Sequence, residues 1–134
     1  MFHKLVFLIL AALAALSVNS AAAGDKAKIR VVIIDGQNNH DWRSTTPVMK
    51  KALEDAGRFT VAVSSNLKPG DKPGKEISEP FPPDLNRYDV IVSNYNGAPW
   101  PKDFNDALDA RLKEGKVALV IVHAANNAFG GWKE

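Results

Sequence analysis

Four short apolar runs, rich in β-branched residues, constrain the fold of this chain more than any other feature of its sequence. They lie within residues 28–35, 59–65, 88–97 and 117–122. A strand with one face in water alternates apolar and polar residues, whereas a nearly unbroken apolar run is typical of a strand buried on both faces. The runs therefore favour a parallel sheet that is covered on both sides.

Segments with helical periodicity separate these runs. Residues 44–57 place apolar side chains at helical spacing, with Thr46 as the expected cap, Pro47 in the first turn and Gly57 at the end. Residues 101–115 repeat the pattern. Strands that alternate with helices predict an α/β fold with a parallel sheet and helices on both faces.

One segment, residues 66–86, shows no periodicity and is rich in proline, glycine and charge. This composition predicts a long surface loop.

The N-terminus has the layout of a secretory signal peptide. A short basic start precedes an apolar run, and the small residues Ala21 and Ala23 stand at the −3 and −1 positions before Gly24. The apolar run is short for a membrane span, and an uncleaved anchor is the alternative. We expect residues 1–23 to be removed near Ala23, giving a secreted or periplasmic protein that meets a membrane only through the uncleaved signal peptide.

Composition excludes several classes of function. The chain has no cysteine, which rules out disulfides, thiolate nucleophiles and cysteine-ligated zinc. The net charge is +2, with acidic and basic residues interspersed, so we expect no nucleic-acid partner.

Polar residues follow three of the four predicted strands. Because the carboxyl ends of parallel strands lie at one edge of a sheet, these residues should meet there and form a ligand site. Their donors and acceptors suit a polyhydroxylated ligand, and a tryptophan could stack on a sugar face. The candidate catalytic residues are His40 and His123, and the candidate substrate-binding residues are Asn38, Asn39, Asp41, Trp42, Asn94, Asn96, Asn126 and Asn127.

Other roles stay open for these residues. Asparagine and aspartate after a strand often make turns, and either tryptophan beside the loops, Trp42 or Trp100, could simply cover the core. The two histidines could act in general acid–base catalysis, because imidazole titrates near neutral pH. They could instead bind a divalent metal with Asp35 or Asp41, although their spacing forms no short metal-binding motif. The sequence leaves the cofactor undetermined.

Three stretches, residues 28–61, 88–101 and 119–129, resemble the ThuA-like (trehalose utilisation) proteins. The resembling motifs are a His-Asp-Trp loop after the first strand and a later strand that ends in His-Ala-Ala. The resemblance implies a flavodoxin-like fold of the class I glutamine amidotransferase superfamily. It also implies a small carbohydrate as partner, from the metabolism of trehalose, related disaccharides or 3-keto sugars.

The resemblance to amidotransferases does not extend to their reaction. Those enzymes need a cysteine at a turn where this chain has Ala124 and Ala125 after His123, so a cysteine-dependent glutaminase is excluded. A sugar isomerase or hydrolase remains open. The alternative is a non-catalytic carbohydrate-binding or accessory module on the same fold.

The number of predicted elements is small for this fold. A flavodoxin-like sheet has about five strands, whereas four can be identified here, so residues 24–134 are expected to form the N-terminal portion of a longer domain. A helix is about 10 Å wide and strands are ~4.8 Å apart. Two helices thus cover roughly one face of four strands, and we expect exposed apolar surface on the other.

Overall fold

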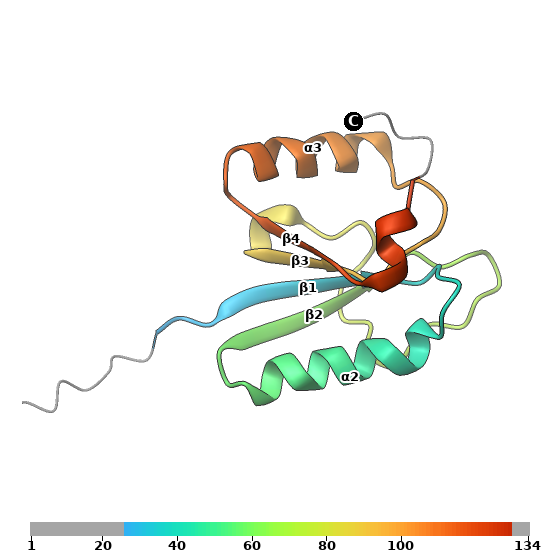
Figure 1. The fold of residues 1–134 in the computed structure, drawn as a ribbon, viewed down its shortest axis with the longest axis horizontal. Coiled ribbons are helices and arrows are strands. Elements are labelled where there is room, and N and C mark those ends of the chain that lie inside the picture. The colour runs from blue at the N-terminus through green and yellow to red at the C-terminus, as the bar shows by residue number, and fades with distance from the viewer. Residues whose placement is uncertain (1–25, 130–134) are drawn as a thin grey trace, which may run out of the picture.

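Four parallel strands form one sheet in the computed structural model, which describes residues 26–129 (Figure 1). The strand order is β2-β1-β3-β4, the order of flavodoxin-like folds, and the predicted α/β class is confirmed. The strands are β1 (Ile29–Asp35), β2 (Phe59–Ser65), β3 (Val90–Ser93) and β4 (Ala118–Ile121).

Two helices cover the sheet, one on each face, as Figure 1 shows. They are α2 (Trp42–Asp55) and α3 (Lys102–Lys113); two short 3₁₀ helices, η1 (Leu85–Arg87) and η2 (His123–Asn127), complete the described elements. The predicted placement of helices on both faces is confirmed, so the two helices share the cover between the faces instead of shielding one face and leaving the other bare. The chain leaves β1 on one side of the sheet and β3 on the other.

The central strand β1 explains why its sequence run is unbroken. Val31 and Ile33 pack toward α2, whereas Val32 and Ile34 belong to the cluster that includes Phe104 and Leu108 of α3. All four β1 residues from Val31 to Ile34 are at most 1% exposed. Both faces of this strand are core from Val31 to Ile34, so a polar residue fits only near its ends, where Arg30 and Asp35 lie.

Helix α2 begins earlier than predicted. Asp41 caps it, because its carboxylate accepts a hydrogen bond from the Ser44 amide at 3.3 Å. The predicted cap, Thr46, is buried within the helix, and Pro47 follows it there rather than in the first turn. Proline inside a helix removes one backbone hydrogen bond. The helix nevertheless begins before Pro47, because the Asp41 cap sets its start.

The long loop after β2 is only partly a surface segment. Its residues Ser78 and Glu79 donate backbone hydrogen bonds to the Val63 carbonyl at 3.0 and 3.1 Å, and Ser64 donates its hydroxyl to the Pro80 carbonyl at 2.8 Å. Glu79 also forms a parallel bridge with Ser64. The end of the loop thus covers the outer edge of β2.

At the opposite edge of the sheet, β4 is largely exposed. Val120 is 47% exposed and Ile121 is 46% exposed. The expected exposed apolar surface is present, but it lies along this edge strand rather than across a whole face.

An ion pair joins β1 to the start of β3 at the amino ends of the strands. The Arg30 guanidinium donates to both carboxylate oxygens of Asp89, at 2.6 and 3.1 Å, and the Arg30 amide donates to one of them at 2.8 Å. These bonds hold the pKa of Asp89 at about 2. Both side chains remain substantially exposed.

The predicted signal peptide, residues 1–23, lies outside the described residues. Within residues 26–129, no helix is both long enough and apolar enough to cross a membrane.

Candidate functional site

The carboxyl ends of the strands gather the loops that the sequence singled out. The helix after β1 and the helix after β3 lie on opposite faces, so the loops that lead into them separate at this edge (Figure 1). In open α/β sheets, ligands bind where neighbouring connections diverge in this way. Residues 36–41 follow β1, residues 94–101 follow β3, and η2 follows β4 after a single residue.

The two histidines lie against each other at this edge. The ring centroids of His40 and His123 are 4.7 Å apart, and the ring planes meet at 69°, an edge-on arrangement. Both residues are exposed to solvent. Side chains that are 83 positions apart by their numbering thus form one pair of titratable groups open to a ligand.

His123 has an unusual backbone conformation. Its φ is +43°, in the left-handed region that residues other than glycine seldom adopt. It stands at the turn between β4 and η2, and such strained residues cluster at functional sites. A sharp strand-to-helix turn of this kind is also how some hydrolases present a reactive side chain at the top of a sheet.

Four asparagines of the predicted site hydrogen-bond to one another and join two loops. The Asn38 amide group donates to the Asn94 backbone carbonyl at 3.1 Å and to its side-chain oxygen at 3.3 Å. Asn96 donates to the Asn39 side chain at 3.2 Å. The two loops are so close at Gly97 that a Cβ added there would lie 2.2 Å from the Cβ of Gln37 in the loop after β1.

These bonds give the asparagines a positioning role in the described structure. Asn94 is 5% exposed and also donates to the hydroxyls of Thr45 and Thr46, at 3.1 and 3.2 Å. Asn126 and Asn127 differ from them, because both lie exposed on η2, the short helix that begins at His123. Whether any of these residues binds a ligand remains a prediction.

Neither tryptophan is free to stack on a sugar, which corrects that expectation. Trp42 is the first residue of α2 and is 5% exposed; the Arg43 guanidinium lies 4.1 Å from its ring centroid, and Gly74 approaches its edge. Trp100 is also 5% exposed and packs among aromatic rings, with its centroid 5.5 Å from that of Phe104. Both rings contribute to packing.

Asp41, predicted to bind substrate, has a structural role at the start of helix α2 and is exposed. Its carboxylate and its backbone carbonyl cap helix α2, accepting hydrogen bonds from Ser44 and Thr45. The predicted cap, Thr46, lies five residues later, so the role of Asp41 in capping is a finding of the structure.

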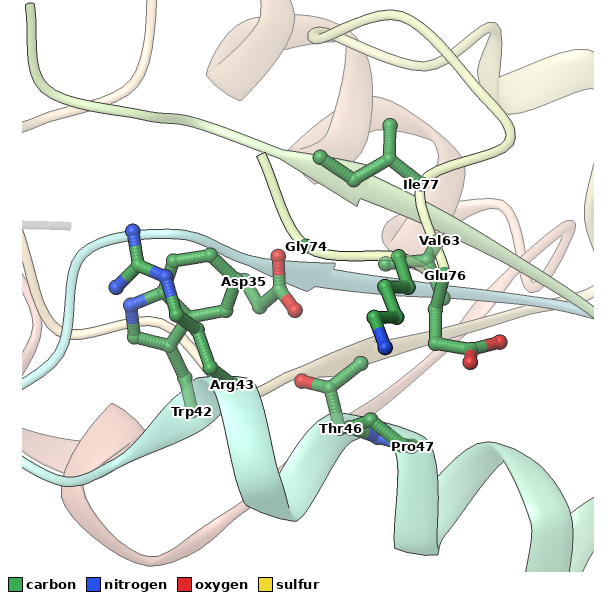
Figure 2. Close-up of a pocket in the computed structure, with 10 residues that line it drawn as sticks. Asp35, Trp42, Arg43, Thr46, Pro47, Val63, Gly74, Glu76 and Ile77 are labelled. Atoms are coloured by element: carbon green, nitrogen blue, oxygen red, sulfur yellow. The ribbon is translucent and has the colours of Figure 1, made fainter. Parts of the chain in front are cut away.

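A buried carboxylate, which the sequence analysis considered only as a metal ligand, lies beneath these loops. Asp35 ends β1 and is 1% exposed. Burial raises its pKa, and the hydrogen bond from the Ser65 hydroxyl, the neighbouring Thr46 hydroxyl and the nearby charge of Arg43 oppose that rise. The carboxylate borders a cavity of about 20 Å³, enough for one water molecule, beside α2 (Figure 2).

A larger hollow lies on the other side of the sheet, between α3 and β4. Its volume is about 570 Å³. Leu108, Leu112, Leu119 and Ile121 supply an apolar lining, and Asn126 of η2 brings a polar group to it. Pockets with mostly apolar walls and a few polar groups are typical ligand sites.

No group of three histidine, cysteine, aspartate or glutamate side chains in residues 26–129 is arranged to hold a metal ion.

Comparison with known proteins supports the resemblance seen in the sequence. No protein-family model matches the chain, and no curated protein sequence matches it. A crystal structure of a protein from Parabacteroides merdae that is assigned as ThuA-like does match, with a TM-score of 0.65 and 34% sequence identity. The match covers 78% of this chain and 36% of that protein, so this chain spans about a third of its length. The chain is thus related in sequence and in fold to a ThuA-like protein.

Proposed function

We propose that this chain carries the acid–base site of a ThuA-like protein that acts on a disaccharide or on a keto-sugar made from one. The observation that carries the proposal is the contact between His40 and His123, with ring centroids 4.7 Å apart at the carboxyl edge of the sheet. The relation to a ThuA-like protein supports the choice of a sugar as substrate.

Two neighbouring imidazoles suit isomerisation of a keto-sugar. A neutral imidazole removes the proton from the carbon next to the carbonyl, and an imidazolium gives a proton to the carbonyl oxygen, producing an enediol. Return of a proton to the former carbonyl carbon, with loss of the proton from the neighbouring hydroxyl, completes the isomerisation. Imidazole exists in both protonation states near neutral pH, so one ring can serve in each role.

We assign the sugar hydroxyls to the exposed carboxamides of Asn126 and Asn127, which lie on η2 with His123. Asn38 and Asn94 bond to each other and hold the loops instead. Ligand recognition would then come mainly from the segment after β4.

Exchange of hydrogen for deuterium tests the acid–base step without knowledge of the final product. The protein is incubated in D₂O with 3-keto-trehalose, and deuterium on the carbons next to the carbonyl is measured by mass spectrometry. We expect exchange with the native protein, and a loss of at least about 100-fold in His40→Gln and His123→Gln, the usual contribution of a general acid or base. Lys51→Gln, on the exposed side of α2, is the matched control. Equal exchange in all four proteins would contradict the proposal.

A non-catalytic carbohydrate-binding module is the second candidate, and the hollow of about 570 Å³ beside Asn126 favours it. Binding of trehalose without deuterium exchange, with Leu119→Trp blocking the binding, would support this function over the first.

We also propose that the protein is exported and cleaved between Ala23 and Gly24, on the evidence of its N-terminal sequence. N-terminal sequencing of protein from the native host is the measurement. Recovery of intact Met1 from a membrane fraction would instead indicate an uncleaved anchor.

A further inference from the structure

The loop after β3 contains an asparagine followed by a glycine, and the proposed reaction gives this pair no role. Asn96 is the one asparagine of the sequence that precedes a glycine. The pair is chemically labile, because the backbone nitrogen of the second residue can attack the side-chain carbonyl carbon of the first. Glycine favours this attack, since it has no Cβ to obstruct the ring that forms.

Packing in the folded protein fixes the glycine of this pair. A Cβ added at Gly97 would meet not only the Cβ of Gln37 at 2.2 Å but also the phenol oxygen of Tyr95 at 2.7 Å. Atoms in proteins do not approach a Cβ so closely, so glycine is the residue that fits where the two loops meet. The fold therefore requires, after Asn96, the residue that leaves its side chain most reactive.

The local structure leaves the reacting groups available. Asn96 and Gly97 are both partly exposed. Within residues 26–129 the Gly97 N–H donates to no backbone or side-chain acceptor, so its nitrogen can lose its proton to solvent. In the same part of the chain, the Asn96 side chain is restrained by its amide N–H, which donates to the Asn39 side-chain oxygen at 3.2 Å. That distance is at the long end of the normal range for a hydrogen bond.

We propose that Asn96 is a site of spontaneous covalent modification, restrained by its hydrogen bond to Asn39. The Gly97 nitrogen loses its proton to hydroxide and bonds to the side-chain carbonyl carbon of Asn96. The bond from that carbon to the amide nitrogen breaks, and the nitrogen takes up a proton from water and leaves as ammonia. Water then opens the cyclic imide at either carbonyl, giving aspartate or isoaspartate at position 96. Nothing is oxidised or reduced.

Either product changes the edge of the sheet that carries the histidine pair. The new carboxylate cannot donate the hydrogen bond to Asn39, so one of the bonds that join the two loops is lost. Its negative charge lies beside Asn39, the residue before His40. Isoaspartate also adds a carbon to the backbone where Gly97 is packed against Gln37. These effects do not depend on the proposed reaction.

Incubation of the purified protein at mildly alkaline pH tests the proposal without any substrate. Peptide mass spectrometry detects the replacement of the amide by a carboxylate, and chromatography separates the isoaspartate and aspartate forms of the peptide. Among the asparagines of residues 26–129, we expect Asn96 to be modified first. Asn96→Gln should show no modification at this position, because its longer side chain would have to form a larger ring. An unmodified Asn96 in the folded protein, with urea-unfolded protein as the positive control, would overturn the proposal.

Asn39→Ala tests the restraint on the side chain. Asn39 is exposed, so the variant should fold, and it removes the acceptor of the Asn96 amide. We expect modification to proceed about 2- to 10-fold faster, the factor that corresponds to one typical hydrogen bond. Lys51→Gln, on the exposed side of α2, is the matched control and should keep the native rate. Equal rates in the native and Asn39→Ala proteins would overturn the role given to this hydrogen bond.

Asn96→Asp reproduces one product and tests its effect on the histidine pair. We expect the ring signals of His40 to shift in ¹H–¹³C NMR spectra, and to shift less in Asn96→Ser, which loses the amide without adding a charge. The His40→Gln spectrum assigns these signals. Equal spectra of native protein and Asn96→Asp would overturn the link to the histidines. A shift in these signals without deuterium exchange on the sugar would contradict the proposed function and leave the modification site intact.

Discussion

Strands β1 and β3 are tied together at both ends, and the two ties differ in kind. At the amino ends, Arg30 and Asp89 form an ion pair in contact with water. At the carboxyl ends, the buried Asn94 donates its backbone N–H to the Ile34 carbonyl of β1 at 2.9 Å and its side-chain N–H group to Thr46, and the buried Asp35 lies beside it at the end of β1. The amino-end tie lowers the pKa of its carboxylate, whereas the carboxyl-end tie leaves a carboxylate whose pKa is raised.

This difference indicates that the two ends serve different purposes. An exposed ion pair contributes modestly to stability and requires little of its surroundings. A buried carboxylate carries a desolvation cost, and the hydroxyls of Ser65 and Thr46 and the charge of Arg43 near Asp35 only partly offset it. The carboxyl ends of the strands carry the histidine pair, so the cost of burying this carboxylate falls at the candidate site.

The largest predicted effect is at the buried tie. Asn94→Ala removes three side-chain hydrogen bonds and leaves the Thr46 hydroxyl without its donor. We expect the free energy of unfolding to fall by about 2–3 kcal/mol, measured by urea denaturation. Asn96→Ala, in the same loop and with one side-chain bond at 3.2 Å, should lose less. Equal losses of unfolding free energy in the two variants would show that burial of the Asn94 hydrogen bonds adds nothing to stability.

A smaller effect is predicted at the exposed tie. Asp89→Asn breaks the bidentate pair with Arg30 but leaves both groups accessible to water. The loss of stability should be well below that of Asn94→Ala and should shrink as salt is added, because ions screen exposed charges. A loss that exceeds that of Asn94→Ala, or that is independent of salt, would break the comparison between the two ends.

The smallest predicted effect is on the pH dependence of stability, where the contributions of Asp89 and Asp35 should change in opposite directions as the pH falls. The stabilisation from Asp89 is complete above its unfolded pKa of 3.8 and is lost as the pH falls through about 2. Asp35 has a raised pKa, so its destabilising effect is complete above that folded pKa and disappears as the pH falls to 3.8.

The measurement is the difference in unfolding free energy between the native protein and each variant across the acidic range. For Asp89→Asn the advantage of the native protein should decrease toward low pH. For Asp35→Asn it should increase. If this difference changed in the same direction with pH for both variants, burial of the Asp35 carboxylate would not destabilise the folded protein.

The sequence predicted the strands and the class of fold because their signal is local. Residues 59–65 match β2 at both ends, and the unbroken run before Asp35 reflects a strand with core on both faces. The sequence also predicted that His40 and His123 would meet, because parallel strands place their carboxyl ends together.

The details of the site depended on contacts that no local pattern encodes. The start of α2 was misplaced because Asp41, Thr45 and Thr46 are all suitable caps, and only the path of the loop selects Asp41. Trp42 is buried against a loop that includes Gly74, which is distant in the sequence. The neighbours of Asp35 come from β2 and α2, so the sequence alone could not show that its carboxylate is buried against Ser65 and Thr46.

The central position of β1 has a consequence for the order in which the chain folds. β1 meets β2 across 30 residues, as in the Ser65–Asp35 bond, and meets β3 across 59, as in the Arg30–Asp89 pair. Closing the shorter segment costs less chain entropy, and helix α2 within it shortens the distance further. We expect β1, α2 and β2 to assemble first, also during synthesis from the N-terminus. The hydrogen bond between Asp35 and Ser65 would then form before Asn94 packs against β1. The contact between the two histidines would form last, on a sheet whose first half is already folded.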